Sequence, residues 1–202
     1  MLGRYNESNI FFLDEVGFNV SMRSKFGRSK VGTTPFITVP NIRSRNISVC
    51  CCMSKSGQIF KKTSLRPYNI QLFNTFIEDF LNYLDENNLS NYLIILDNVR
   101  FHKNQEALSL ITTKGHQMKF LPPYSPFLNP IENMFSKWKN SVKRRQSNDE
   151  EELFHNIESS LNEITSSDCL GFYQNMMTYI SRSLNREEII LQNVEVQKNE
   201  KI

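Results

Sequence analysis

The sequence contains no hydrophobic run of the roughly 18 or more residues that a membrane-spanning helix needs. Met1 is not followed by the charged segment and apolar core of a secretion signal. We therefore expect a soluble, intracellular protein with no membrane partner. Only four cysteines are present, at positions 50–52 and 169, and they match neither a disulfide framework nor a metal-ligand spacing. We interpret them as reduced fillers of core and surface, because adjacent strand side chains point to opposite faces.

Acidic residues are missing from one long stretch of the chain. None lies between Val16 and Ile77, whereas ten Lys or Arg residues fall there. Residues 1–145 hold 20 basic and 10 acidic residues, and residues 149–202 hold 4 and 11. A segment of one charge sign suits contact with a phosphate backbone. A solvated basic face without a partner is the alternative.

The length and composition limit the number of domains. A chain of 202 residues with 39% hydrophobic residues can bury the core of one globular domain but hardly two. We expect a main domain over residues 1–145, an acidic helical extension of the same domain over 146–192, and a polar, disordered tail over 193–202.

Short apolar runs alternate with helical patterns, which predicts an α/β fold with a mixed sheet and flanking helices. Strands are expected at residues 10–13, 47–53, 58–63, 92–96 and 118–121, and helices at 68–87, at 104–114, from 129 to about 145, and twice in the acidic tail. Asn129 and Pro130 should open the helix at 129, with Asn129 as its N-cap.

Three carboxylates occupy positions where ligand sites form. Asp14 and Asp97 each follow an apolar strand, and Glu132 lies in the first turn of a later helix. Brought together, such groups form an oxygen-rich site for Mg²⁺ or Mn²⁺. Each also has an ordinary interpretation, since an Asp after a strand often forms a turn, and Glu132 stands where a capping-box glutamate would stand.

The residues around these carboxylates resemble a known family. The segments Phe12–Phe18 (FLDEVGF), Leu96–His102 (LDNVRFH) and Leu121–Asn133 (LPPYSPFLNPIEN) are similar to the three catalytic blocks of mariner-type and related bacterial insertion-sequence transposases. The blocks occur in the family's order, and 34 residues separate Asp97 from Glu132, as in its DD34E branch. The resemblance covers roughly residues 10–145.

The resemblance implies a ribonuclease H-like fold and a DDE catalytic domain over residues 1–145. It implies that Asp14, Asp97 and Glu132 are the catalytic residues and bind divalent metal, Mg²⁺ or Mn²⁺, as two ions that serve DNA strand cleavage and strand transfer. Supporting positions would be Asn98, His102 and Asn133. His102 could contact DNA, orient a carboxylate, or be only a polar residue at a helix start.

The loop that precedes Glu132 is rich in proline. Pro122, Pro123 and Pro126 should stiffen the loop so that it presents Glu132 opposite the two aspartates. Tyr124 within this loop either faces DNA or packs against the protein, and we expect packing.

Two groups of basic residues are candidates for contact with the DNA backbone, Arg28, Lys30, Arg43 and Arg45 in the first basic loop and Lys139, Lys143, Arg144 and Arg145 on the later helix. Along the chain, the second group has no acidic neighbour until Asp149. A helix C-terminus by itself also favours cations.

Complete transposases of this family carry helix-turn-helix modules ahead of the catalytic domain. Here the first predicted strand begins about ten residues after Met1. We therefore expect a truncated copy, a split gene product or a domain retained for another use, with weak, salt-sensitive and sequence-tolerant DNA binding. It would form a homodimer or associate with a full-length transposase, in the nucleus of a eukaryote or the cytoplasm of a bacterium. The alternative to an active enzyme is a catalytically silent remnant that binds nucleic acid or dimerises.

Overall fold

The computed structural model describes residues 7–23, 28–34, 36 and 45–189. The helices and strands along the chain are β1 (Ile10–Phe18), β2 (Ile47–Ser54), β3 (Ile59–Ser64), α1 (Ile70–Glu86), β4 (Leu93–Leu96), α2 (Gln105–Thr113), β5 (Gln117–Phe120), α3 (Pro130–Arg145), α4 (Glu150–Leu161) and α5 (Ser166–Leu184), with short 3-10 turns η2 (Glu7–Asn9), η3 (Arg100–Lys103) and η4 (Pro126–Leu128). Every predicted strand and helix is present. Within these ranges, no helix has the length and apolar character needed to cross a membrane.

The strands form one mixed sheet with β1 at its centre, in the order β3-β2-β1-β4-β5. β1 pairs antiparallel with β2 and parallel with β4. β1 is longer than predicted, because β2 provides pairing partners from Phe11 to Phe18 while β4 pairs only with residues 10–13. The expectation that this strand ends at Asp14 was therefore wrong, and Asp14 lies in its middle.

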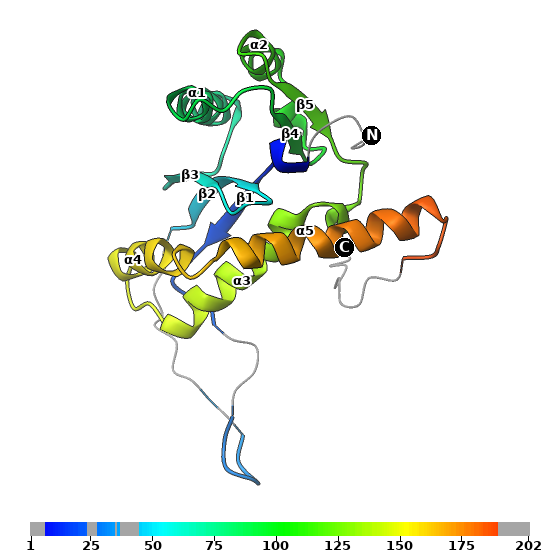
Figure 1. Ribbon diagram of the computed structural model, residues 1–202. Coiled ribbons are helices and arrows are strands. Elements are labelled where there is room, and N and C mark those ends of the chain that lie inside the picture. The colour runs from blue at the N-terminus through cyan, green and yellow to red at the C-terminus, as the bar shows by residue number, and fades with distance from the viewer. Residues whose placement is uncertain (1–6, 24–27, 35, 37–44, 190–202) are drawn as a thin grey trace, which may run out of the picture.

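Helices cover both faces of the sheet (Figure 1). α1 and α2 pack on one face, where β1 contributes Phe11 and Leu13 to the core. α3, α4 and α5 cover the other face, where β1 contributes Phe12 and Val16. Alternate residues of β1 thus enter two separate cores, as the pleat of a strand requires.

The acidic C-terminal helices belong to the core on the α3 side. α4 and α5 both pack against α3. Trp138 of α3 is fully buried, and its indole nitrogen donates a hydrogen bond to the backbone oxygen of Ile157 in α4 at 2.9 Å. The predicted disordered tail, residues 193–202, lies outside the described residues.

All four cysteines are buried free thiols. Cys51 enters the core on the α3 side, and Cys50 and Cys52 enter the core on the α1 side. The alternation was predicted, but the assignment of some of them to the surface was wrong, because helices cover both faces of this sheet.

Candidate active site

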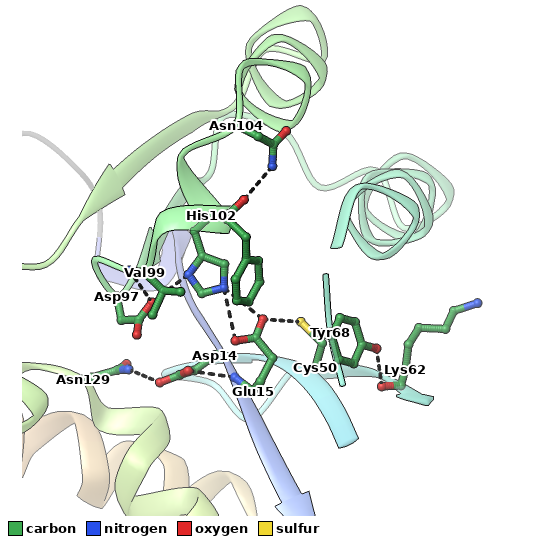
Figure 2. Close-up of polar contacts among 11 residues, drawn as sticks. Asp14, Glu15, Cys50, Lys62, Tyr68, Asp97, Val99, His102, Asn104 and Asn129 are labelled. Carbon is green, nitrogen blue, oxygen red and sulfur yellow. Dashed lines mark hydrogen bonds and ion pairs between the residues drawn. The ribbon is translucent and has the colours of Figure 1, made fainter. Parts of the chain in front are cut away.

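The sheet brings two of the predicted carboxylates to adjacent positions. β1 and β4 pair in parallel up to Leu13 and Leu96, so Asp14, within β1, and Asp97, directly after β4, each follow the last paired residue. Asp14 is 8% exposed, whereas Asp97 is partly open to solvent. Figure 2 shows the two side chains near one another.

The third carboxylate, Glu132, comes from the first turn of α3, which packs on β1. Glu132 is accessible to solvent and lines a cavity of about 440 Å³. The cavity wall also includes Asp97, Asn98, Asn129 and the proline-rich loop 121–126. The fold therefore gathers residues from β4, the loop and α3 around one hollow beside Asp14.

The three carboxylates influence one another electrostatically. Burial raises the pKa of Asp14 to about 8, helped by the negative charges of Glu132 and Asp97 and opposed by a hydrogen bond from the Glu15 backbone N–H. Partial desolvation in the cavity raises the pKa of Glu132 although its surface is accessible, and Asp97 adds to the rise while Lys139 opposes it. A divalent cation would relieve this repulsion, since it favours the ionised carboxylates.

Asp14 is held at both oxygens. Its Oδ1 accepts a hydrogen bond from the Glu15 N–H at 2.8 Å, and its Oδ2 accepts one from Asn129 Nδ2 at 2.8 Å (Figure 2). Asn129 occupies the predicted N-cap position of α3, but its side chain makes no capping hydrogen bond. The expected capping role of this side chain was wrong, because it points to Asp14. No capping box involving Glu132 forms here either.

His102 lies between Asp97 and Glu15, and Glu15 is on the α1 side of the sheet. Its imidazole is 0% exposed, with Nδ1 2.7 Å from Asp97 Oδ1 and Nε2 3.0 Å from Glu15 Oε1. Nδ1 is in ion-pair contact with Asp97 and has no hydrogen-bond partner among the described residues. Burial lowers the pKa of His102, but the contacts with Asp97 and Glu15 outweigh it and raise the pKa to about 9. This placement favours the positioning interpretation of His102 over contact with DNA.

Glu15 points away from Asp14, because consecutive residues of β1 face opposite sides of the sheet. Its carboxylate lies between His102 and the thiol of Cys50, which is 3.4 Å away. Phe73 of α1 closes this side of the imidazole, with ring centroids 4.7 Å apart. Glu15 is therefore a partner of His102 and not a fourth member of the cavity.

The donor atoms around the cavity fit a hard divalent cation. The cavity wall supplies carboxylate oxygens of Asp97 and Glu132, and Asp14 lies next to it, bonded to the lining residue Asn129. The side-chain oxygen of Asn129 is buried with no hydrogen-bond partner among the described residues. Among the described residues, no three His, Cys, Asp or Glu side chains lie close enough together to hold a metal ion in their present conformations. Binding would require the side chains to converge, and Glu132 has the freedom to do so because it is accessible to solvent.

The other predicted supporting residues differ in position. Asn98 lines the cavity, directly after Asp97. Asn133 is half-buried on α3 and is not one of the lining residues. Tyr124 lines the cavity too, but the residue is 98% exposed, so the expectation that it packs against the protein was wrong.

The basic residues of the first loop are only partly described. Arg28 and Lys30 are exposed, and Arg43 lies outside the described residues. Arg45 is exposed, and its backbone N–H donates a hydrogen bond to the Glu150 side chain at the start of α4.

The basic end of α3 has acidic neighbours in space, contrary to expectation. Lys139 and Lys143 are half-buried, with Lys139 near enough to Glu132 to lower its pKa. Arg145 forms an ion pair with Glu163 at 2.5 Å, and Arg144 lies 3.8 Å from the same carboxylate. These basic residues are far from acidic residues along the sequence but not in the fold, because the acidic segment that contains α4 packs back onto α3.

Sequence reasoning missed two residues of the site. Glu15 was visible as a second carboxylate beside Asp14, and strand alternation could have placed it on the opposite face. The contact of Asn129 with Asp14 had no local signal, since 115 positions separate the two residues.

Comparison with known sequences identifies a family for most of the chain. The sequence model of the family described as DDE superfamily endonuclease matches residues 9–154. This range contains all three carboxylates and ends within α4. No curated protein sequence matches the chain.

Solved structures share the fold at low sequence identity. The chain resembles a mariner Mos1 paired end complex with Mg (TM-score 0.77, 13% identity, 94% of this chain and 59% of that chain) and a pre-cleavage Mos1 transpososome (0.75, 12%, 92% and 58%). It also resembles the catalytic domain of Mos1 mariner transposase (0.71, 11%, 95% and 88%). The fold is thus that of this catalytic domain, which confirms the expected ribonuclease H-like architecture. The chain spans less than two thirds of the length of the proteins in the two complexes.

Proposed function

Since the chain belongs to the DDE superfamily endonuclease family, we propose that its acidic cavity cleaves a DNA phosphodiester and joins the freed end to target DNA. The observation that carries the proposal is the placement of Asp14, Asp97 and Glu132 beside one cavity by β1, β4 and α3. The silent remnant is the less favoured alternative, because all three carboxylates and the cavity are retained.

The three carboxylates would hold two ions of Mg²⁺ or Mn²⁺. These ions would activate the attacking hydroxyl and stabilise the leaving oxygen. The side chains of this protein prepare the site for that task. Asn129 and the Glu15 N–H fix the carboxylate of Asp14, and His102 holds Oδ1 of Asp97. Burial raises the pKa of Asp14 to about 8, so this carboxyl would give up its proton to solvent in order to hold a cation.

The reaction has two displacements at phosphorus. In the first, water attacks a phosphodiester, the P–O3′ bond breaks, and a 3′-hydroxyl and a 5′-phosphate result. In the second, this 3′-hydroxyl attacks a phosphodiester of target DNA, forms a new P–O bond and displaces a target 3′-oxygen, which takes up a proton. Neither displacement needs an external energy source. Hydrolysis of a phosphodiester by water is favourable in the first, and one phosphodiester replaces another in the second.

DNA and a second protein chain are the proposed partners. Solved relatives of this fold are described as a transpososome, a paired end complex and a strand transfer complex. Relatives are also described with Mg and with Mn. The exposed Arg28 and Lys30 and the half-buried Lys139 and Lys143 supply charge for phosphate contacts. The compartment that holds the chromosome is the proposed location, the nucleus in a eukaryote and the cytoplasm in a bacterium.

Nicking of supercoiled plasmid by the purified chain, with Mg²⁺ or Mn²⁺ and without either, tests the proposal. We expect metal-dependent nicking by the wild type and none by Asp97→Asn, which removes one negative charge at nearly constant shape. Asp85→Asn is the matched control, because Asp85 pairs with Lys114 on the helical layer away from the cavity. Equal nicking by the wild type and Asp97→Asn would contradict the proposal, as would a wild type that binds DNA and metal but never nicks.

A further inference from the structure

Asn129 uses its side chain differently from the other asparagines at helix starts. Asn69 and Asn104 cap α1 and α2, each accepting a backbone N–H hydrogen bond at 2.9 Å. Asn129 holds the same position before α3 but makes no capping bond and donates to Asp14 instead. A capping hydrogen bond normally stabilises a helix, so this site gives up helix stabilisation for a contact with a carboxylate.

The other end of the Asn129 amide is unsatisfied. The residue is only 3% exposed, and its Oδ1 has no hydrogen-bond partner among the described residues. Buried polar atoms without partners are uncommon in folded proteins and call for an explanation. This oxygen lies beside a cavity lined with carboxylates, where a cation or its hydration shell would approach.

We propose that Asn129 is a positioning residue for the metal site, an inference that rests on the proposed function. Its Nδ2 locks one oxygen of Asp14, and the Glu15 N–H locks the other, so the carboxylate has one orientation before metal arrives. Its Oδ1 remains as an acceptor inside the site. Partners of this kind orient the metal-binding groups and raise the affinity for the ion.

The test compares Mn²⁺ binding, followed by the electron paramagnetic resonance of free Mn²⁺, with thermal unfolding of the metal-free protein. Asn129→Leu removes the donor at similar volume. Asn129→Ser keeps a residue that can cap α3 and support folding but is too short to reach Asp14. We expect both variants to bind Mn²⁺ about 10- to 100-fold more weakly than the wild type.

Asn156→Leu is the matched control, since Asn156 is 6% exposed and bonds to Ser147 on the far part of the α3 layer. It should lower the melting temperature and leave the Mn²⁺ affinity unchanged. Wild-type affinity in Asn129→Leu and Asn129→Ser would overturn the inference. A wild type that binds Mn²⁺ through Asn129 but nicks no DNA would leave the inference standing and remove the proposed function.

Tyr124 carries a second inference from an independent observation. Its backbone has φ +56°, the left-handed region that residues with a side chain rarely adopt, and the residue is 98% exposed at the cavity wall. The neighbouring Pro123 restricts the loop that holds it there. Backbone strain combined with an exposed aromatic ring is typical of a functional site and not of packing.

We infer that Tyr124 stacks on a nucleobase of the DNA next to the phosphate in the cavity. The ring belongs to the same wall as Asp97 and Glu132, so a strand whose phosphate reaches these carboxylates would pass it. An aromatic side chain stacks on any base, because every base has a π face. The contact would hold the strand without reading its sequence, in keeping with binding that tolerates many sequences.

A short oligonucleotide that carries the fluorescent base 2-aminopurine, with Ca²⁺ present to support binding, probes this contact. Tyr124→Gly should bind the oligonucleotide about 5- to 100-fold more weakly and lose the fluorescence quenching that stacking causes. The same variant should melt at a higher temperature than the wild type, since glycine tolerates positive φ. Tyr124→Phe keeps the ring and should behave as the wild type does. Unchanged binding and quenching in Tyr124→Gly would overturn the inference.

Discussion

Among single residues, Asp14 and Glu15 are neighbours in sequence with separate tasks. Asp14 lies on the α3 side of the sheet and accepts a hydrogen bond from Asn129, which lines the cavity, while Glu15 faces α1 and contacts His102. The strand pleat alone divides them. One strand thus supplies a carboxylate to the cavity and a partner for the imidazole that holds Asp97, so both sides of the sheet contribute to the site.

The raised pKa of Asp14 has a defined effect on stability. Its pKa of about 8 in the folded protein lies above the ordinary value of 3.8, so the folded state keeps a proton that the unfolded chain has released. The metal-free protein should therefore lose stability through this group as the pH rises from about 4 to about 8. The loss ends once the folded state also ionises.

Asp14→Asn removes this titration and should stabilise the metal-free protein, by a few kcal/mol at most at neutral pH and by little near pH 4, from about 1.4 kcal/mol per pH unit. Urea unfolding of both proteins in EDTA at several pH values measures the difference. Because His102 titrates in both proteins, the difference reports Asp14 together with its electrostatic coupling to Glu132 and Asp97. A gap between the two proteins that does not widen with pH would contradict the prediction.

Between elements, the turn that joins β2 to β3 meets the start of α5. Gly57 in this turn has φ +88°, and a Cβ atom built there would lie 2.8 Å from the Ser166 Cα. A backbone atom of a capped helix cannot move aside easily, since Thr165 and Asp168 fix the start of α5 with a capping box. The β meander and α5 are therefore fitted to each other at a position where only glycine is free of strain.

Gly57→Ala should cost about 3 kcal/mol of unfolding free energy, combining the left-handed backbone with the clash. Gly115→Ala is the matched control, because Gly115 has φ +78° but no atom within 4 Å of a built Cβ. That variant should lose only the backbone contribution of about 1 kcal/mol. Urea unfolding compares them, and equal losses would show that α5 yields at Ser166.

In the molecule as a whole, the acidic C-terminal helices return to the basic part of the chain. Lys61 pairs with Glu158, Lys137 with Asp168, and Arg145 with Glu163. The contrast between a basic front and an acidic end of the sequence is therefore reduced once the chain folds. Surface pairs of this kind contribute little stability each, about 0 to 1 kcal/mol. They do determine which Lys and Arg side chains remain unpaired and available for contact with DNA.

DNA binding should consequently depend more on the exposed Arg28 and Lys30 than on the end of α3. Replacing Arg28 and Lys30 by Ala should weaken binding to a short duplex and reduce the salt slope by about one for each phosphate that is no longer neutralised. Replacing Arg144 and Arg145 by Ala should have a smaller effect, because Glu163 already neutralises part of their charge. Binding isotherms over a range of salt concentrations test this. A larger loss of affinity in the second variant would refute it, and Mn²⁺ affinity should stay unchanged in both.

The order and type of the helices and strands follow from the sequence alone, because apolar periodicity records which side of each element is buried. The sequence also predicts which carboxylates belong together, because the blocks around Asp14, Asp97 and Glu132 resemble the catalytic blocks of one family and follow its order. Both the periodicity and the blocks are contained in short segments, so they can be recognised without knowledge of the fold.

The tertiary structure was needed for the length of β1, the partner of Asn129, the exposure of Tyr124 and the pairing of Arg145. β1 continues past Asp14 because β2 supplies its hydrogen bonds. The other three depend on which distant segment lies nearby or leaves the side chain uncovered. Residues far away in sequence determine where a strand ends, which partner a polar side chain has and which charges lie nearby. Short-range sequence patterns therefore cannot predict these features.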